Sequence, residues 1–103
     1  YNYWSAMPMP VEQAAVVPPE AADVVVVRLL LRPGTWYEDQ RERFKPFDRL
    51  VEPDPAMRAD VVSIVRRALS RGRRAFVLVN NKAEGSSPLT VTALARQLAY
   101  EPR

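Results

Sequence analysis

Two uninterrupted apolar runs most constrain how this chain can fold. Residues 23–31 read "DVVVVRLLL" and residues 74–80 read "RAFVLVN". A strand with one solvated face alternates apolar and polar side chains, whereas a continuous β-branched or aromatic run is typical of a strand buried on both faces. The two runs therefore predict buried strands of the kind that parallel sheets contain.

The segment between the two runs predicts a helix. Asp54 is a good capping residue, Pro55 suits the first helical position and Gly72 suits the exit. Because apolar residues recur at helical spacing between these limits, we expect an amphipathic helix packed on the sheet. The predicted apolar stripe consists of Met57, Val61, Ile64, Val65, Ala68 and Leu69.

A second helix follows the last strand. Ser87 can cap it, Pro88 suits its first position, and an apolar stripe follows at spacings of three and four: Val91, Leu94, Ala95 and Leu98. The order strand, helix, strand, helix predicts an α/β fold with parallel strands and right-handed crossovers.

The remaining segments give weaker patterns. Residues 1–4, "YNYW", are consistent with the end of an earlier strand, and residues 9–17 with a short helix before two prolines. Residues 32–53 predict a long loop containing a short helix, for which Thr35 and Glu38 could form a capping box. Loops of this length in a compact domain are often functional.

Composition excludes several chemistries. The 103 residues include no cysteine and no histidine, so disulfides, thiol nucleophiles, Cys/His zinc sites and histidine-based triads are ruled out. No apolar run approaches the roughly 20 residues that span a bilayer, and no secretory signal pattern is present, so we expect a cytoplasmic protein. The sequence leaves the cofactor open: magnesium bound by carboxylates is compatible with the composition, but no acidic cluster suggests a metal site.

Arg28 is the most informative single residue, because it interrupts the first apolar run. Strand alternation places it on one face with Val24, Val26 and Leu30. A buried guanidinium needs a carboxylate, a phosphate or dense hydrogen bonding. Arg28 is therefore either an anion-binding residue near the carboxyl end of a parallel strand or one partner of a structural ion pair.

Polar side chains gather directly after the second strand. Asn80 and Asn81 supply amide donors and acceptors, Lys82 supplies a cation, and Glu84 is a candidate general acid or base. The alternative is an ordinary polar turn, in which asparagine is common. Ser86 and its neighbours precede the last helix, where backbone N–H groups could bind an anion, although serine at this position is more often a cap.

The densest basic cluster lies between Arg66 and Arg74. It could form a small nucleic-acid-binding surface, but the excess of 15 basic over 12 acidic residues is mild and the cluster coincides with a helix end, where cations are common. We therefore regard nucleic acid as an unlikely partner.

Three blocks of the sequence together resemble the carboxyl-terminal part of the YecE-like family, whose domain has no settled function. They are "YNYWSAMPMPVEQ", "VVVVRLLLRPGTWYEDQRERFKPFDRL" and "FVLVNNKAEGSSPLTVTALARQL", and they follow the family's order over nearly the whole chain. The double asparagine after the last strand is the most specific part. The histidine and glycine usual after the arginine are replaced by "LLL".

The resemblance implies a TIM-type (β/α)8 barrel, of which residues 1–103 would be one segment carrying strands six to eight. Ligands bind such barrels at the carboxyl ends of the strands, frequently through a phosphate. This predicts an anionic or sugar-type small molecule held by Arg28, Asn80, Asn81 and Ser86, with Lys82 and Glu84 as candidates for proton transfer.

Whether any catalysis takes place is left open by the sequence. Three strands cannot close a barrel, so we expect the chain to associate with the remaining strands or with itself. A nucleic-acid-binding module and a structural fragment without activity of its own are the alternatives.

Overall fold

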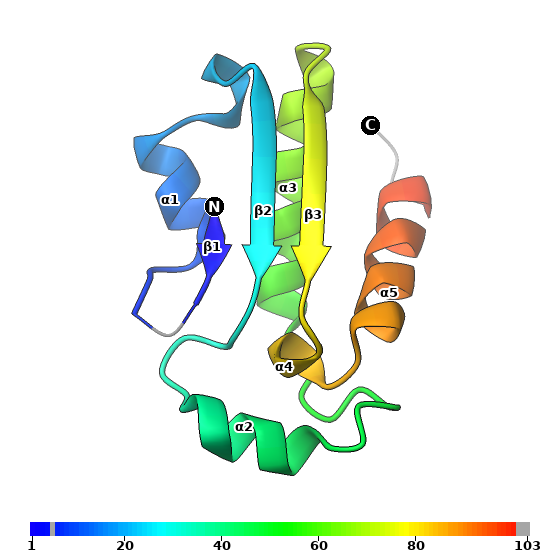
Figure 1. Ribbon diagram of the computed structural model, residues 1–103. Helices are drawn as coiled ribbons and strands as arrows, with labels where there is room; N and C mark the ends of the chain where they lie inside the picture. The colour runs from blue at the N-terminus through cyan, green and yellow to red at the C-terminus, as the bar shows by residue number, and fades with distance from the viewer. Residues whose placement is uncertain (5, 101–103) are drawn as a thin grey trace.

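The computed structural model describes residues 1–4 and 6–100. It contains three strands, β1 (Asn2–Tyr3), β2 (Val24–Leu29) and β3 (Arg74–Val79). The helices are α1 (Pro10–Val16), α2 (Tyr37–Phe44), α3 (Pro55–Ser70), α4 (Asn81–Glu84) and α5 (Ser87–Tyr100), with a short 3-10 helix, η1 (Pro19–Ala21), before β2. Figure 1 shows α2 lying across the carboxyl ends of the strands, away from the other long helices.

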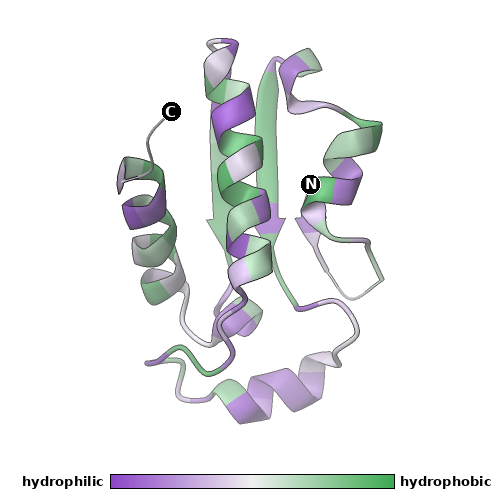
Figure 2. Cartoon of the chain, turned by 180° about the vertical axis from the view of Figure 1, so that it is seen from behind, coloured by the Kyte–Doolittle hydropathy of each residue, from purple (hydrophilic) through white to green (hydrophobic). Residues whose placement is uncertain are grey.

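The strands form one parallel sheet in the order β1-β2-β3. Asn2 pairs with Arg28 in β2, and Val24 to Leu29 pair in unbroken register with Arg74 to Val79. The helix α3 connects β2 to β3, and in the view from behind it crosses in front of the strands with α1 and α5 on either side (Figure 2). The predicted α/β arrangement with parallel strands is therefore confirmed.

The prediction that both strands are buried on both faces is wrong. Val25, Val27 and Leu29 face the helices and are almost fully buried. The opposite face is open: Val26 is 41% exposed and Leu78 is 54% exposed. The apolar runs supply two apolar faces, but the helices among the described residues cover only one of them.

The helix α3 holds the core together, as its pattern predicted. The side chain of Asp54 accepts a hydrogen bond from the backbone N–H of Met57 at 3.1 Å, and Gly72 has a φ of +67° just beyond the helix end. Leu69 was wrongly placed in the apolar stripe, because it is 57% exposed. The buried residues of α3 are Met57, Val61, Val62, Ile64, Val65 and Ala68.

The last helix is less covered than its sequence predicted. In α5 Leu94 is buried, whereas Val91 is 48% exposed and Ala95 is also exposed. The cause is the position of α5, which lies beside β3 and past the edge of the sheet, while α3 lies over the sheet itself (Figures 1 and 2).

The long segment between β2 and α3 contains a helix, as predicted, but the capping box is wrong. The helix α2 begins at Tyr37, and the hydroxyl of Thr35 donates to the carbonyl of Arg32 at 2.6 Å. Thr35 thus closes the turn at Pro33 and Gly34 and does not cap the helix.

The backbone of Arg49 and Val51 lies very close to Gly85, next to α4, and this contact can be used to test the fold. Gly85 has a φ of +130°, and a Cβ there would lie 2.5 Å from the carbonyl oxygen of Arg49 and 2.7 Å from the backbone nitrogen of Val51. Gly85→Ala should therefore lower the free energy of unfolding by more than the roughly 1–2 kcal/mol that a left-handed conformation costs a residue with a side chain.

Gly34→Ala is the matched control. Gly34 also has a positive φ, +85°, but a Cβ there would meet no atom within 4 Å. Urea unfolding of both variants measures the difference. Equal losses of stability would contradict the close approach of the segment around Val51 to Gly85.

Candidate functional site

The carboxyl ends of the strands are covered by the two segments that follow β2 and β3. The segment after β2 carries α2, and the segment after β3 carries α4. They meet through the carbonyl of Glu84, which accepts hydrogen bonds from the backbone N–H groups of Val51 and Glu52, both at 2.9 Å. Ligands of α/β folds bind at this edge of the sheet, so a ligand-binding residue should lie near it.

Arg28 lies near this edge, on the open face of the sheet. It is the second-last residue of β2, in register with Asn2 on one side and Leu78 on the other. Contrary to the expectation from the sequence, Arg28 is exposed. Within residues 1–4 and 6–100 its guanidinium has no ion pair, and neither β2 nor β3 contains an acidic residue. The described part of the chain thus offers no structural partner, and the cation faces solvent.

Asn80 brings an amide to the same face. Its backbone is extended, with φ −96° and ψ 148°, and its N–H donates to the carbonyl of Leu29 at 2.8 Å, so Asn80 continues the alternation of β3. Its side chain therefore lies on the side of Leu78. The oxygen Oδ1 accepts from the backbone N–H of Lys82 at 2.8 Å and caps α4. This bond leaves the amide Nδ2 as the available donor.

Asn81 and Ser86 take part in forming the start of α5. The side-chain oxygen of Asn81 accepts a hydrogen bond from the N–H of Ser87 at 2.7 Å, and the carbonyl of Ser86 accepts one from the N–H of Thr90 at 3.0 Å. Ser86 is itself buried, and Pro88 has no N–H to offer. The backbone N–H groups of Ser87 and Thr90 are thus already hydrogen-bonded and Pro88 has none. The geometry therefore does not support an anion site at Ser86.

Lys82 is directed toward α2. Its Nζ lies 4.9 Å from the centre of the Tyr37 ring and 6.0 Å from that of Phe47. Phe47 has a φ of +64°, a conformation that costs a large side chain about 1–3 kcal/mol and that places its ring beside the cation. A cation over the face of an aromatic ring is attracted by about 0.5–2 kcal/mol. Lys82 therefore links the segment after β3 to the segment after β2.

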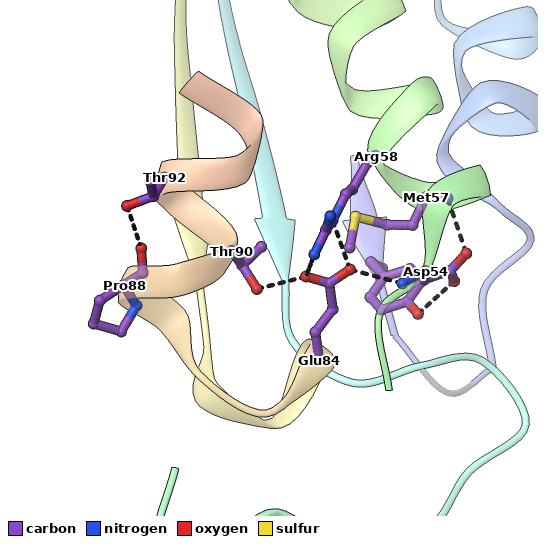
Figure 3. A network of polar contacts seen from close by, with 8 residues as sticks. Asp54, Met57, Arg58, Glu84, Pro88, Thr90 and Thr92 are labelled. Carbon is purple, nitrogen blue, oxygen red and sulfur yellow. Dashed lines mark hydrogen bonds and ion pairs between the residues drawn. The ribbon is translucent and has the colours of Figure 1, made fainter. Parts of the chain in front are cut away.

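Glu84 is fully buried at the centre of a polar network (Figure 3). Arg58 forms a bidentate pair with it, from Nε to Oε2 at 2.9 Å and from Nη2 to Oε1 at 2.8 Å. Oε2 also accepts the N–H of Asp54 at 2.7 Å, and Oε1 the hydroxyl of Thr90 at 2.6 Å. Each carboxylate oxygen thus accepts two hydrogen bonds: both donors to Oε2 come from the start of α3, whereas Oε1 has one donor from α3 and one from α5.

This arrangement assigns Glu84 a structural position. A general acid or base must reach the proton that it transfers, whereas the Glu84 carboxylate is closed off from solvent and its acceptor positions are occupied. The sequence missed the network because Arg58 and Thr90 lie 26 and 6 residues away from Glu84, and no local pattern pairs them.

Asp54 extends the network to β1. Its Oδ2 accepts the hydroxyl of Tyr3 at 2.7 Å, while its other oxygen caps α3. Burial, followed by the hydrogen bond to Asp54, raises the pKa of the Tyr3 phenol, so Tyr3 remains a neutral donor. The first strand is thereby tied to the same helix start as Glu84.

None of the candidate residues lines any of three cavities in the described structure. These cavities have volumes of about 920, 490 and 530 Å³. The largest of these three lies between α3 and α5. Arg28 and Asn80 are therefore on an open surface, whereas Asn81, Glu84 and Ser86 serve local structure.

Two cations of the basic cluster between Arg66 and Arg74 are engaged within the chain. Arg67 pairs with Glu20 through two hydrogen bonds of 2.8 and 2.9 Å, and Arg66 donates to the carbonyl of Leu98 at 3.1 Å. These cations fasten α3 to the segments beside it, so a nucleic-acid interface here gains no support.

Membrane-spanning helices and metal-binding clusters are absent from residues 1–4 and 6–100. No helix in these ranges combines the length and the apolar character that crossing a bilayer requires. The same residues contain no group of three or more aspartates or glutamates placed to hold a metal ion.

The network around Glu84 predicts that a small change in this side chain strongly lowers the free energy of unfolding. Glu84→Gln keeps the shape of the side chain but leaves the Arg58 guanidinium, 17% exposed, without its counter-charge. Breaking a buried pair in this way should lower the free energy of unfolding by about 3–5 kcal/mol, measured by urea unfolding.

Glu52→Gln is the matched control, because Glu52 belongs to a more exposed set of pairs at 3.4 and 3.5 Å from Arg32 and Arg43. It should cost no more than about 1 kcal/mol. If Glu84→Gln cost as little as Glu52→Gln, Glu84 would not hold the two helices together.

Neither the models of protein families, nor the curated proteins, nor the solved structures give a match to this chain.

Proposed function

We propose that the chain supplies three neighbouring strands of a YecE-like barrel and that the carboxyl edge of these strands binds an anionic small molecule of the phosphate or sugar-phosphate type. The proposal of an anionic ligand depends on one observation. Arg28, exposed near the carboxyl end of β2, has no ion pair among the described residues. A permanent cation at this edge of a parallel sheet is suited to an anion.

Asn80 supports the same ligand. Its amide Nδ2 lies on the open face, two residues beyond Leu78, the partner of Arg28 in the register of β2 and β3. A guanidinium and an amide together offer several N–H donors, which is what phosphate oxygens require. Arg28 would fix the anion, and Asn80 would orient it.

The proposal of a barrel depends on two observations, the resemblance in sequence and the structure of the sheet. Three parallel strands, helices on one face and an apolar opposite face are what such a segment would have, with Val26, Phe76 and Leu78 directed toward the interior of the barrel. The lack of cysteine favours a cytoplasmic protein.

The proposed function is the binding of a ligand and includes no catalytic step. The Glu84 carboxylate is engaged by four donors and the Lys82 ammonium by aromatic rings. Proton transfer by either residue remains a prediction from the sequence, without support from the geometry.

A titration tests the site. Inorganic phosphate and glucose 6-phosphate, each added to the isotopically labelled chain at low salt, should shift the Arg28 Nε–H and Asn80 side-chain amide resonances together. Glucose without phosphate separates recognition of the sugar from recognition of the anion. Arg28→Gln should weaken phosphate binding by about tenfold or more, because it removes a charged hydrogen-bond donor.

Arg74→Gln provides the matched control. Arg74 is an exposed arginine on the same open face but at the amino end of β3. This variant should bind phosphate within about twofold of the parent chain, the scale of a distant screened charge. Equal weakening by both variants would show attraction by net charge only and would overturn the site.

A further inference from the structure

The open face of the sheet carries an aromatic side chain at the carboxyl end of β1. Tyr3, the last residue of β1, faces the helices, because it is fully buried and its hydroxyl donates to Asp54. Strand alternation therefore places the residues on either side of Tyr3, which are Asn2 and Trp4, on the open face. Trp4 is 40% exposed. It thus offers an accessible aromatic surface at the edge where ligands of such sheets bind.

Trp4 lies one strand away from Arg28. Asn2 is the register partner of Arg28. The carbonyl of Tyr3 accepts the N–H of Leu30 at 3.0 Å, so β1 and β2 remain paired up to the peptide bond before Trp4. With strands about 4.8 Å apart and a rise of about 3.3 Å per residue, the Cα atoms of Trp4 and Arg28 are about 8 Å apart. A single small molecule can therefore contact both side chains.

Neither of these two side chains is engaged within residues 1–4 and 6–100. The guanidinium of Arg28 has no ion pair there, and none of the cation–π contacts in these ranges involves Trp4. A guanidinium near an indole often stacks on it. Because Arg28 and Trp4 do not bind each other in this way, both remain available to a ligand.

The side chain of Asn2 is a neighbour of both. It lies beside Arg28 in the next strand and two residues before Trp4 on the same face. Its oxygen Oδ1 is shielded from solvent and accepts no hydrogen bond from the described residues, which is unfavourable for an amide. A ligand hydroxyl would supply the missing donor, whereas the acceptor oxygens of a phosphate ester would not.

The three side chains favour different parts of one ligand. The guanidinium of Arg28 binds phosphate oxygens through its paired N–H groups, and the Asn2 oxygen needs a hydroxyl donor. The flat face of Trp4 is suited to a nucleobase, because bases of every kind stack on aromatic side chains. A nucleoside monophosphate carries these groups in the required order, with a hydroxylated ribose between base and phosphate. A hexose phosphate contains no aromatic ring, so it gains less from Trp4.

We propose that the ligand of the carboxyl edge is a nucleoside monophosphate whose base stacks on Trp4. Its phosphate would bind Arg28 and Asn80, and its ribose hydroxyls would donate to Asn2. This inference rests on the proposed phosphate site and adds the nature of the organic group. The site lies on the face that would be the interior of the barrel, so further strands could close the barrel around it. A mononucleotide needs no extended basic surface, in contrast to nucleic acid.

Two ligands that differ only in the base test the proposal. Adenosine monophosphate and ribose 5-phosphate carry the same sugar phosphate, so at low salt the first should bind about tenfold more tightly, the effect of stacking one base. Adenosine, which lacks the phosphate, should bind at least about tenfold more weakly than adenosine monophosphate. The chain has two tryptophans, so in a Trp36→Phe background the quenching of tryptophan fluorescence reports on Trp4 alone.

Two tryptophan variants locate the base. Trp4→Leu keeps an apolar side chain without a ring, so adenosine monophosphate should bind no more tightly than ribose 5-phosphate, while binding of inorganic phosphate stays within about twofold. Trp36→Leu is the matched control, because Trp36 is 77% exposed in the segment after β2 and has no part in the proposed site. It should leave the preference unchanged. If Trp4→Leu does not fold, nuclear Overhauser effects between adenine and Trp4 protons in the parent chain decide the same question.

The variant Asn2→Ala tests the contact with the ribose. It should weaken binding of ribose 5-phosphate about fivefold, the effect of one lost neutral hydrogen bond, and leave inorganic phosphate unchanged. Equal weakening of both ligands would show that Asn2 acts through the strand and would overturn the ribose contact.

Three results would contradict the stacking of a base on Trp4. The first is equal affinity of the parent chain for adenosine monophosphate and ribose 5-phosphate. The second is a preference that is lost in Trp36→Leu and kept in Trp4→Leu. The third is adenosine binding as tightly as adenosine monophosphate. Phosphate binding that depends on Arg28 but shows no preference for the nucleotide would leave the proposed function intact. Phosphate binding that does not depend on Arg28 would overturn the proposed function itself.

Discussion

The buried pair of Glu84 and Arg58 is the interaction on which the rest of the structure depends. Removing two charges from water costs several kcal/mol per ion, and this cost is offset only when every remaining lone pair is satisfied. Here the backbone N–H of Asp54 and the hydroxyl of Thr90 complete the carboxylate. The pair therefore fixes the start of α3, the short helix α4 and the start of α5 relative to one another, and with them the end of β3.

The polar residues after β3 have different roles because they lie on a helix. Consecutive side chains of an α-helix point about 100° apart, as 3.6 residues per turn require. Within α4, Asn81 is thereby directed to the start of α5, Lys82 to the Tyr37 ring of α2 and Glu84 to the buried network. Asn80 precedes the helix and stays on the strand face, which is why it alone of these residues accompanies Arg28.

Local signals in the sequence predicted the elements well. The start of α3 followed from Asp54 and Pro55, because capping depends on residues a few positions apart. The parallel order followed from the two apolar runs and the helix between them. The TIM-type barrel, in contrast, rests on the resemblance and remains a proposal.

Contacts between distant segments could not be predicted in this way. Glu84 has the same polar character as any loop glutamate, and only the fold brings Arg58 to it. Arg28 was expected to be buried because its neighbours are apolar, yet burial depends on what covers the strand, which a local pattern does not contain. The role of Thr35 was misjudged for a similar reason, since its hydroxyl can either cap a helix or close a turn.

The two exposed arginines on a largely apolar sheet face affect how copies of the chain behave toward one another. At low ionic strength Arg28 and Arg74 repel their counterparts on an approaching copy, while the apolar side chains between them attract. Added salt shortens the range of that repulsion to about 8 Å at physiological concentration and leaves the apolar attraction in place. We therefore expect the colloidal stability of the chain to be greatest in dilute buffer and to fall as salt is added.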